Sequence, residues 1–119
     1  MPLVRVELSQ ELFDSSHESI SDAIHQAQVE KLGVPEDDFF QVFTPHQANE
    51  IKYSKTYLGV DRTDLMVIQM TAVHMHGEAA KTEFFATMVG KLADVGVPTS
   101  NVLVSWSENC YGDWYAGKL

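Results

Sequence analysis

The sequence predicts an α/β protein made of two tandem β-α-β units, which form a four-stranded sheet with two helices on one face. The main observation is a weak internal repeat. Residues 32–43 (LGVPEDDFFQVF) and 95–106 (VGVPTSNVLVSW) both give an aliphatic residue, Gly-Val-Pro, three polar residues and an apolar run. The same offset of 63 residues carries the β-prone run 3–8 (LVRVEL) onto 66–71 (MVIQMT).

The first helix is predicted over residues 16–31, after the first strand. Apolar residues recur there at the i, i+3, i+4 spacing that gives a helix one apolar face. Ser15 or Ser16 is expected to cap its start, and Gly33 followed by Pro35 to end it. The apolar face consists of Ile20, Ala23, Ile24, Ala27 and Leu32.

The second helix is predicted over residues 79–94, at the same place in the second unit. Gly96 and Pro98 are expected to end it, as Gly33 and Pro35 end the first. Its apolar face consists of Phe84, Phe85, Met88, Leu92 and Val95.

A β-α-β unit of this size is a crossover connection, so the two strands within each unit should be parallel. The repeat halves span about residues 2–46 and 65–109 of a single domain, 1–119, and the polar linker 44–64 joins them. The face without helices is expected to be apolar, with Val4, Val67 and Val104 on it. Oligomerisation would then cover that face.

Composition excludes several classes of function. The net charge of −9 would repel a phosphate backbone, so nucleic-acid binding is not expected. No apolar run approaches the roughly 18 residues of a membrane span. The single cysteine, Cys110, can form no intrachain disulfide and has no base beside it in sequence. These features fit a cytoplasmic protein whose Cys110 is not a nucleophile.

Pro2 is the first candidate for chemistry. The initiator Met1 is normally removed before so small a residue, which would leave a secondary amine on a rigid ring. An α-amino group has an ordinary pKa of about 7.7–8, so it can serve as an acid or a base near neutral pH. Pro2 opens the first strand with no preceding linker, which places this amine at an end of the sheet, where a pocket can form.

Several short stretches then resemble one family. They are Met1-Pro2-Leu3-Val4, Val34-Pro35-Glu36-Asp37-Asp38, Leu58-Gly59-Val60-Asp61-Arg62-Thr63 and Gly112-Asp113-Trp114. With the repeat and the chain length, they resemble the tautomerase superfamily, and within it the malonate semialdehyde decarboxylase branch. Nearly the whole chain is covered, in the family's order and spacing.

The resemblance implies an active site with Pro2 as its amino-terminal proline and Asp38 as its aspartate, Asp37 being the adjacent alternative. It implies a homotrimer that uses no cofactor and acts on a small oxo acid or aldehyde. The reaction would be tautomerisation, decarboxylation or hydration. The alternatives are a non-enzymatic trimer that binds carbonyl compounds or a protein partner, and a metal-binding protein that uses His74 and His76.

The family places two arginines where this chain has His74 and His76. Arginine is always charged and binds a carboxylate with a planar fork, whereas histidine is half charged only near pH 6.5. On a strand, residues i and i+2 point to the same side, so both imidazoles would face one pocket and bind substrate. Two half-exposed histidines, or a metal pair completed by His46, are the alternatives, and no metal is expected.

Aromatic residues near the C-terminal end complete the candidate site. The resemblance places Trp114, with Tyr111 and Tyr115, at the wall of the substrate pocket. The family continues after this tryptophan with Ser-Phe-Gly, and this chain with Tyr115-Ala116-Gly117, so its pocket wall differs. An aromatic cluster at a subunit contact is the alternative.

Overall fold

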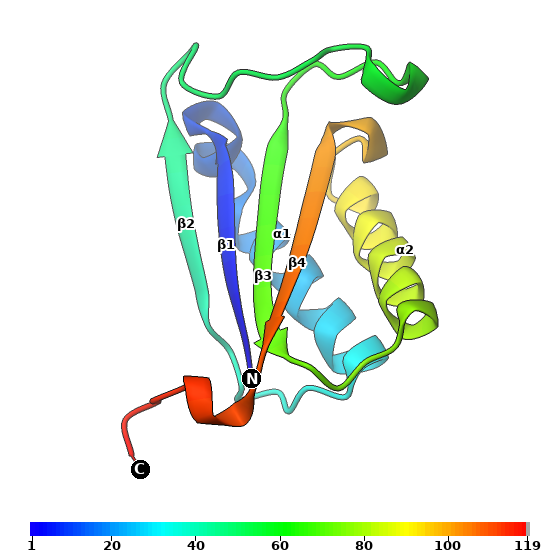
Figure 1. Cartoon of the computed structure of the whole chain (residues 1–119). Helices are drawn as coiled ribbons and strands as arrows, with labels where there is room; N and C mark the ends of the chain where they lie inside the picture. Colours follow the sequence, from blue (N-terminus) through cyan, green and yellow to red (C-terminus); the bar gives the residue numbers. More distant parts are fainter. Residues whose placement is uncertain (119) are drawn as a thin grey trace.

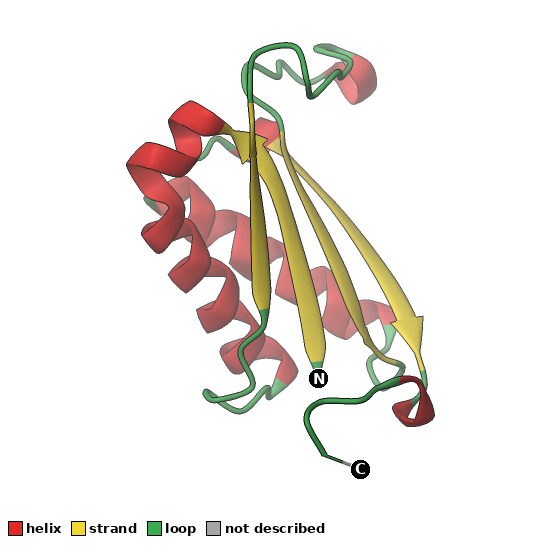
Figure 2. Ribbon diagram, turned by 90° about the vertical axis from the view of Figure 1, so that its left-hand side faces the viewer, coloured by secondary structure: helices red, strands yellow, loops and turns green. Residues whose placement is uncertain are grey.

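The computed structural model describes residues 1–118 and has the architecture that the repeat predicts. One sheet contains all four strands, and two helices cover one of its faces (Figures 1 and 2). The strands are β1 (Pro2–Ser9), β2 (Gln41–His46), β3 (Met66–Val73) and β4 (Val102–Asn109), and the helices are α1 (Gln10–Leu32) and α2 (Glu78–Asp94). Short 3-10 turns occupy Tyr57–Gly59, Thr99–Asn101 and Tyr111–Asp113.

The strand order is β2-β1-β3-β4. Within each unit the strands are parallel, as predicted, whereas the central strands β1 and β3 run antiparallel. The start of β1 therefore lies at the same end of the sheet as the ends of β3 and β4, and the chain's two termini lie at that end too (Figure 1). Residues 47–65 cross the opposite end.

Helix α1 begins at Gln10, so the predicted cap at Ser15 or Ser16 is wrong. Ser9 caps it instead, because its Oγ accepts a hydrogen bond from the Leu12 backbone N–H at 3.2 Å. Leu12 and Phe13 pack against the core, which extends the apolar face toward the strand. The end of the helix is as predicted, with Gly33 in the left-handed conformation at φ 67°.

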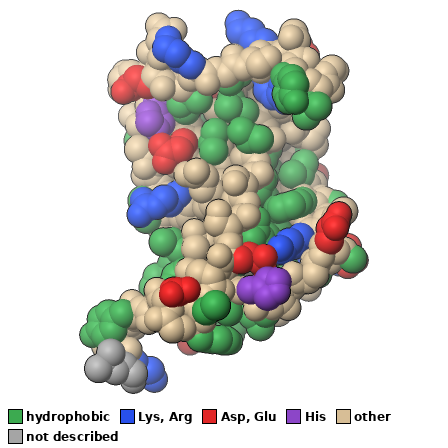
Figure 3. All heavy atoms as spheres, viewed as in Figure 1, with side chains coloured by type: hydrophobic (Ala, Val, Ile, Leu, Met, Phe, Trp, Pro, Cys, Tyr) green, Lys and Arg blue, Asp and Glu red, His purple; other side chains and the backbone are tan. Residues whose placement is uncertain are grey.

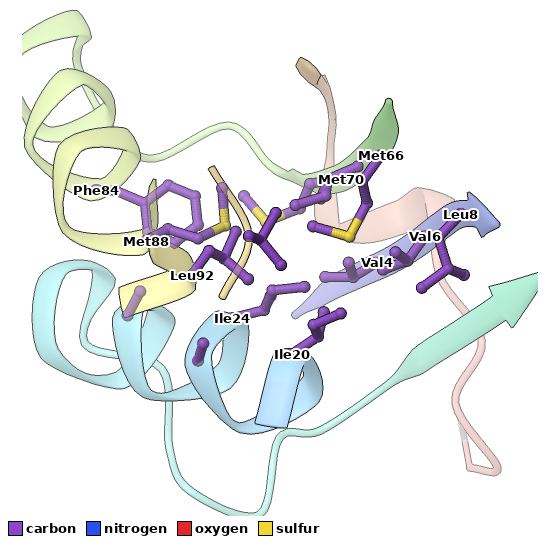
Figure 4. Packing of buried hydrophobic residues seen from close by; sticks show 14 residues of the cluster. Val4, Val6, Leu8, Ile20, Ile24, Met66, Met70, Phe84, Met88 and Leu92 are labelled. Carbon is purple, nitrogen blue, oxygen red and sulfur yellow. The ribbon is translucent and has the colours of Figure 1, made fainter. Parts of the chain in front are cut away.

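The core lies between the sheet and the two helices (Figure 4). Full burial of one large apolar side chain stabilises the fold by about 1.5–3 kcal/mol, so this layer is the main source of stability. The largest fully buried apolar side chains are Leu8, Ile20, Ile24, Met66, Ile68, Met70, Phe84, Met88 and Leu92.

The open face of the sheet is more polar than expected. Val4 and Val104 point to the helices, and of the three expected valines only Val67 shares the alternation of the outer face. Arg5, Gln69 and Ser105 lie side by side across β1, β3 and β4 on that face. Figure 3 shows its middle largely in the colour of uncharged polar side chains and backbone. The open face therefore mixes polar side chains with exposed apolar ones such as Val42 and Leu103, and the expectation is wrong for Val4 and Val104.

The turns that follow the two Gly-Val-Pro motifs have the same geometry. The Asp38 N–H donates to the Pro35 carbonyl at 3.0 Å, and the Asn101 N–H donates to the Pro98 carbonyl at 2.9 Å. Asn101 is buried, and its Oδ1 accepts a hydrogen bond from the backbone N–H of Thr63 at 2.8 Å. The two repeats therefore match in turn structure as well as in sequence.

Neither helix, over the described residues 1–118, combines the length and the apolar character that crossing a membrane requires.

Candidate active site

A cavity of about 270 Å³ lies at the end of the sheet where β1 begins. Three segments enclose it: the start of β1, the loop after α1, and the ends of β3 and β4 with the residues that follow them. Its walls are mostly apolar, which raises the strength of any charge interaction inside it. The lining residues are Met1, Pro2, Leu32, Gly33, Val34, Pro35, Asp38, Ala72, Val73, Met75, His76, Trp106 and Tyr111.

Pro2 is buried in the wall of this cavity. It is the first residue of β1 and lies opposite Ala72 of β3 in the antiparallel pair. Pairing within the sheet therefore holds the proline ring in place, and Met1, which precedes it, also lines the cavity. With Met1 attached, the Pro2 nitrogen is a tertiary amide, and removal of Met1 would turn it into a secondary amine.

Asp38 is the acid that meets the amino terminus. Its Oδ2 lies 3.4 Å from the amino nitrogen of Met1, and its side chain is 18% exposed. Its other oxygen, Oδ1, is buried and has no hydrogen-bond partner among the described residues. Asp37 is exposed and does not line the cavity. Of the two adjacent acids, Asp38 is therefore the one beside Pro2.

His74 and His76 do not share one side, so that expectation is wrong. β3 ends at Val73, and both histidines lie in the loop before α2, where strand alternation no longer applies. His76 lines the cavity, with its ring centroid 6.0 Å from that of Trp106 in an edge-on arrangement. The His74 side chain is 76% exposed, and its Nδ1 lies 3.1 Å from Glu108 Oε1.

Glu108, near the end of β4, holds His74 away from the cavity. Its Oε1 also accepts a hydrogen bond from Lys81 Nζ at 2.9 Å. The hydrogen bond from Lys81, and secondarily that from His74, hold the pKa of the Glu108 carboxyl below its ordinary value of 4.5.

Trp114 does not line the cavity, contrary to its expected place. Its Nε1 donates to Asn109 Oδ1 at 2.7 Å, and Tyr115 is exposed. Tyr111 lines the cavity, as expected, and Trp106 supplies the rest of the aromatic wall. Trp106 is not among the residues predicted from the sequence, although it ends the second repeated apolar run, on the helix-facing side of a strand, and that position could have indicated it.

His46 lies at the opposite end of the sheet, at the end of β2, where its Nε2 is 2.6 Å from Glu7 Oε1. It cannot join His74 and His76 around one ion. Among residues 1–118, no group of three or more His, Cys, Asp or Glu side chains has an arrangement that could hold a metal. The wide groove at that end, of about 820 Å³, is lined by Ser9, Asp14, Asp64, Leu65 and residues of the 47–65 segment.

A duplicated β-α-β fold with a proline and an aspartate at the mouth of a largely apolar cavity is the arrangement of the tautomerase class. Two family models, both described as tautomerase enzyme, match residues 2–67 and 37–117. The chain belongs to the tautomerase family.

Individual relatives agree with this assignment. The probable tautomerase YusQ of Bacillus subtilis (strain 168) is 30% identical over 99% of this chain and 94% of its own length. The FG41 malonate semialdehyde decarboxylase inhibited by 3-bromopropiolate is 33% identical, with a TM-score of 0.87 over 97% of this chain and 88% of that one. A malonate semialdehyde decarboxylase, studied for its decarboxylase and hydratase activities, is 29% identical, with a TM-score of 0.89 over 98% and 91%.

Proposed function

We propose that this chain is a cofactor-independent enzyme that acts on a small oxo acid or aldehyde through the amino group of Pro2. The observation that carries the proposal is the distance of 3.4 Å between the amino terminus and Asp38, in a cavity whose wall contains Pro2. A carboxylate beside an amine favours the protonated amine. A protonated amine in an apolar cavity can polarise the carbonyl of a bound substrate.

Each side chain then has a distinct role. The Pro2 amine, once Met1 is removed, moves the proton. Asp38 stabilises the charged form of the amine and orients it. His76 donates a hydrogen bond to the substrate's carboxylate or carbonyl. Trp106 and Tyr111 exclude water from the reacting carbons.

The favoured reaction is decarboxylation of a 3-oxo acid, with hydration and tautomerisation as related activities. The ammonium of Pro2 would hydrogen-bond the 3-carbonyl oxygen. The bond between the carboxylate carbon and C2 breaks and CO₂ leaves. The electron pair of the broken bond stays on the remaining fragment and forms the enolate. The Pro2 ammonium then gives a proton to C2, which yields the aldehyde, and the amine takes up a proton from solvent. The likeness to two malonate semialdehyde decarboxylases supports this choice over the other reactions of the family.

The two histidines in place of arginines point to a weaker carboxylate grip than the family's. Only His76 reaches the cavity, and an imidazole offers one hydrogen bond where guanidinium offers a bidentate fork. We propose a substrate with a single carboxylate, or a neutral aldehyde, as the better fit.

We also propose a cytoplasmic homotrimer, which the family resemblance implies. Edge strand β2 supports an assembly, because the exposed apolar residues Phe39, Phe40 and Val42 lie in or beside it. An exposed edge with apolar side chains favours pairing with another chain.

The test begins with the intact mass of the purified protein, which shows whether Met1 is removed. The processed protein is then incubated with malonate semialdehyde, and the release of CO₂ is followed. A form with one additional residue before Pro2 is the control, because its Pro2 nitrogen is an amide that cannot titrate. Equal activity in the two forms would refute the role of the Pro2 amine.

The inhibitor of the FG41 relative, 3-bromopropiolate, gives a second test. The processed protein is treated with 3-bromopropiolate and digested, and the modified peptide is located by mass spectrometry. We expect the label on Pro2 and none on the extended form. A label on Cys110 alone would contradict the proposal.

A further inference from the structure

We propose that Glu108 is a positioning residue that holds His76 in the wall of the cavity. The inference rests on the proposed function only in its kinetic part, since the placement of His76 can be measured without a substrate. Glu108 does not line the cavity and touches no residue that we assign to proton transfer.

The loop that carries His76 is short, and Glu108 contacts the residues on both sides of it. Only four residues, 74–77, connect the end of β3 to the start of α2. One oxygen atom, Glu108 Oε1, binds both sides of this connection. It lies 3.1 Å from Nδ1 of His74 at the strand end, and 2.9 Å from Nζ of Lys81 in the opening turns of the helix.

A backbone hydrogen bond also joins the start of this loop to β4, at Asn109, the residue after Glu108. The N–H of His74 donates to the Asn109 carbonyl at 2.8 Å, and the Lys81 N–H donates to the Gly77 carbonyl at 3.2 Å. Between these anchors, Met75 and His76 both line the cavity. Because both ends of a four-residue loop are fixed, the direction of His76 has little freedom left.

Trp106 forms the part of the cavity wall that His76 packs against. The ammonium of Lys81 lies 5.1 Å from the centroid of the Trp106 ring, and the His76 ring meets the same tryptophan edge-on at 6.0 Å. Glu108 therefore holds Lys81 against the tryptophan that lines the cavity. Its carboxylate acts on His76 through the loop and through Trp106.

The assignment separates the roles of the two histidines. His76 contacts the substrate, whereas His74 acts through Glu108 and contacts none. The site therefore has one substrate-binding imidazole, and its direction is set by an ion-pair cluster outside the cavity.

The experiment compares E108Q with E30Q. Glu30 of α1 pairs with Lys91 at 3.0 Å, and Lys91 lies on α2, the helix that carries Lys81. Because Lys91 is near the far end of α2, E30Q removes a similar ion pair and leaves the 74–77 loop intact. In the substrate-free protein we expect the nuclear Overhauser contacts between the His76 and Trp106 rings to weaken in E108Q and to persist in E30Q. Unchanged contacts in E108Q would overturn the proposal.

The kinetic arm is a double-mutant cycle with H76Q, which isolates coupling between the two residues. For malonate semialdehyde we expect E108Q to raise KM about five- to ten-fold, with kcat changed less than about two-fold, because a partly exposed cluster acts mainly on substrate placement. In the H76Q background the same change should have almost no effect on KM. An equal rise in both backgrounds would overturn the positioning role.

A second variant guards against an unrelated effect of the glutamine. K81M keeps the aliphatic stem over Trp106 but removes the charge, and it should weaken the same ring contacts. Absence of turnover in the wild-type protein would refute the proposed function, and the ring contacts would still decide the role of Glu108.

Discussion

The amino nitrogen of Met1 lies 3.4 Å from Oδ2 of Asp38, at the mouth of a cavity that the neighbouring Pro2 lines. An ammonium and a carboxylate at this distance attract each other. Removal of one residue would shift the positive charge from a flexible methionine to a proline ring that the sheet holds in place. Catalysis would then depend on processing of the chain.

The ring of Pro2 should matter as well as its amine. In P2A, after removal of Met1, the amine is primary and free to rotate, so its proton is less well placed for transfer. We expect kcat/KM to fall by about a hundred-fold or more. Steady-state kinetics on protein whose mass shows complete removal of Met1 will measure this. A fall of less than about three-fold would mean that the ring is dispensable.

Replacing Asp38 should make the Pro2 amine easier to deprotonate. D38N removes the anion that favours the protonated amine, so the pKa of that amine should fall. Titration of ¹⁵N-labelled proline by NMR measures the change directly. D37N is the matched control, because Asp37 is exposed and away from the cavity. A larger shift in D37N than in D38N would reverse the assignment of the two acids.

Substrate affinity should depend on His76 and only indirectly on His74. A charged hydrogen bond contributes about 1.5–3 kcal/mol, so its loss in H76Q should weaken binding of an acidic substrate about ten- to a hundred-fold. Steady-state kinetics with the acid in the wild type and in H76Q will measure the loss.

A neutral aldehyde analogue is the control for this effect, because it has no carboxylate, and its KM should change little in H76Q. H76R should keep or strengthen binding of the acid, because guanidinium is always charged and offers a bidentate fork. An equal rise in KM for the acid and the aldehyde in H76Q would show that His76 does not bind the carboxylate.

Glu108 should make stability depend on pH in the acidic range. Its pKa in the folded protein is lowered, chiefly by Lys81 and then by His74, below the ordinary value of 4.5. Such a group stabilises the fold above its unfolded pKa, and the contribution is lost as pH falls through the folded pKa. The wild type should therefore be more stable than E108Q at pH 7, and the difference should shrink below pH 4.5.

Urea unfolding of both proteins across this pH range will measure the difference. K81M is the informative background, because Lys81 is the larger cause of the shift. The pH dependence of the difference should be weaker there. A difference that stays constant down to pH 2 would contradict the ion pairing of Glu108.

Assembly is the fifth prediction. We expect light scattering to give the mass of a trimer at micromolar concentration. Charge on the exposed edge should weaken that assembly, so V42K on strand β2 should shift the mass toward the monomer. A stable wild-type monomer at that concentration would remove the homotrimer from the proposal.

The fold could be predicted from the sequence because the repeat contains the signals that end its helices. Gly-Val-Pro occurs at the end of both helices, and the spacing between copies places every strand and helix in register. The start of α1 was missed because Ser9, Ser15 and Ser16 are all good caps, and the choice depends on Leu12 and Phe13 packing against the sheet. Local propensity cannot distinguish such candidates without the tertiary contact.

The positions of the candidate residues were predicted where they depend on chain topology. They were missed where they depend on the residue at which a strand ends. Pro2 and Asp38 come together because each stands at a fixed place in the first unit. His74 and His76 were expected on one side, but β3 ends at Val73, before both histidines, so strand alternation does not apply to them. The role of Trp106 depends on which face of β4 turns inward, and the misassigned Val104 shows that this was not read correctly.

The matching turns at Asp38 and Asn101 differ in what their side chains contact. Asp38 lies beside a charged chain end, whereas Asn101, its counterpart 63 residues later, binds the neutral backbone N–H of Thr63. The counterpart of Pro2 is Leu65, which is joined to the linker on its amino side and lies at the other end of the sheet. The second repeat therefore has an amide contact where the first has an ionic contact, and Leu65 has no free amino group that could take the part proposed for Pro2.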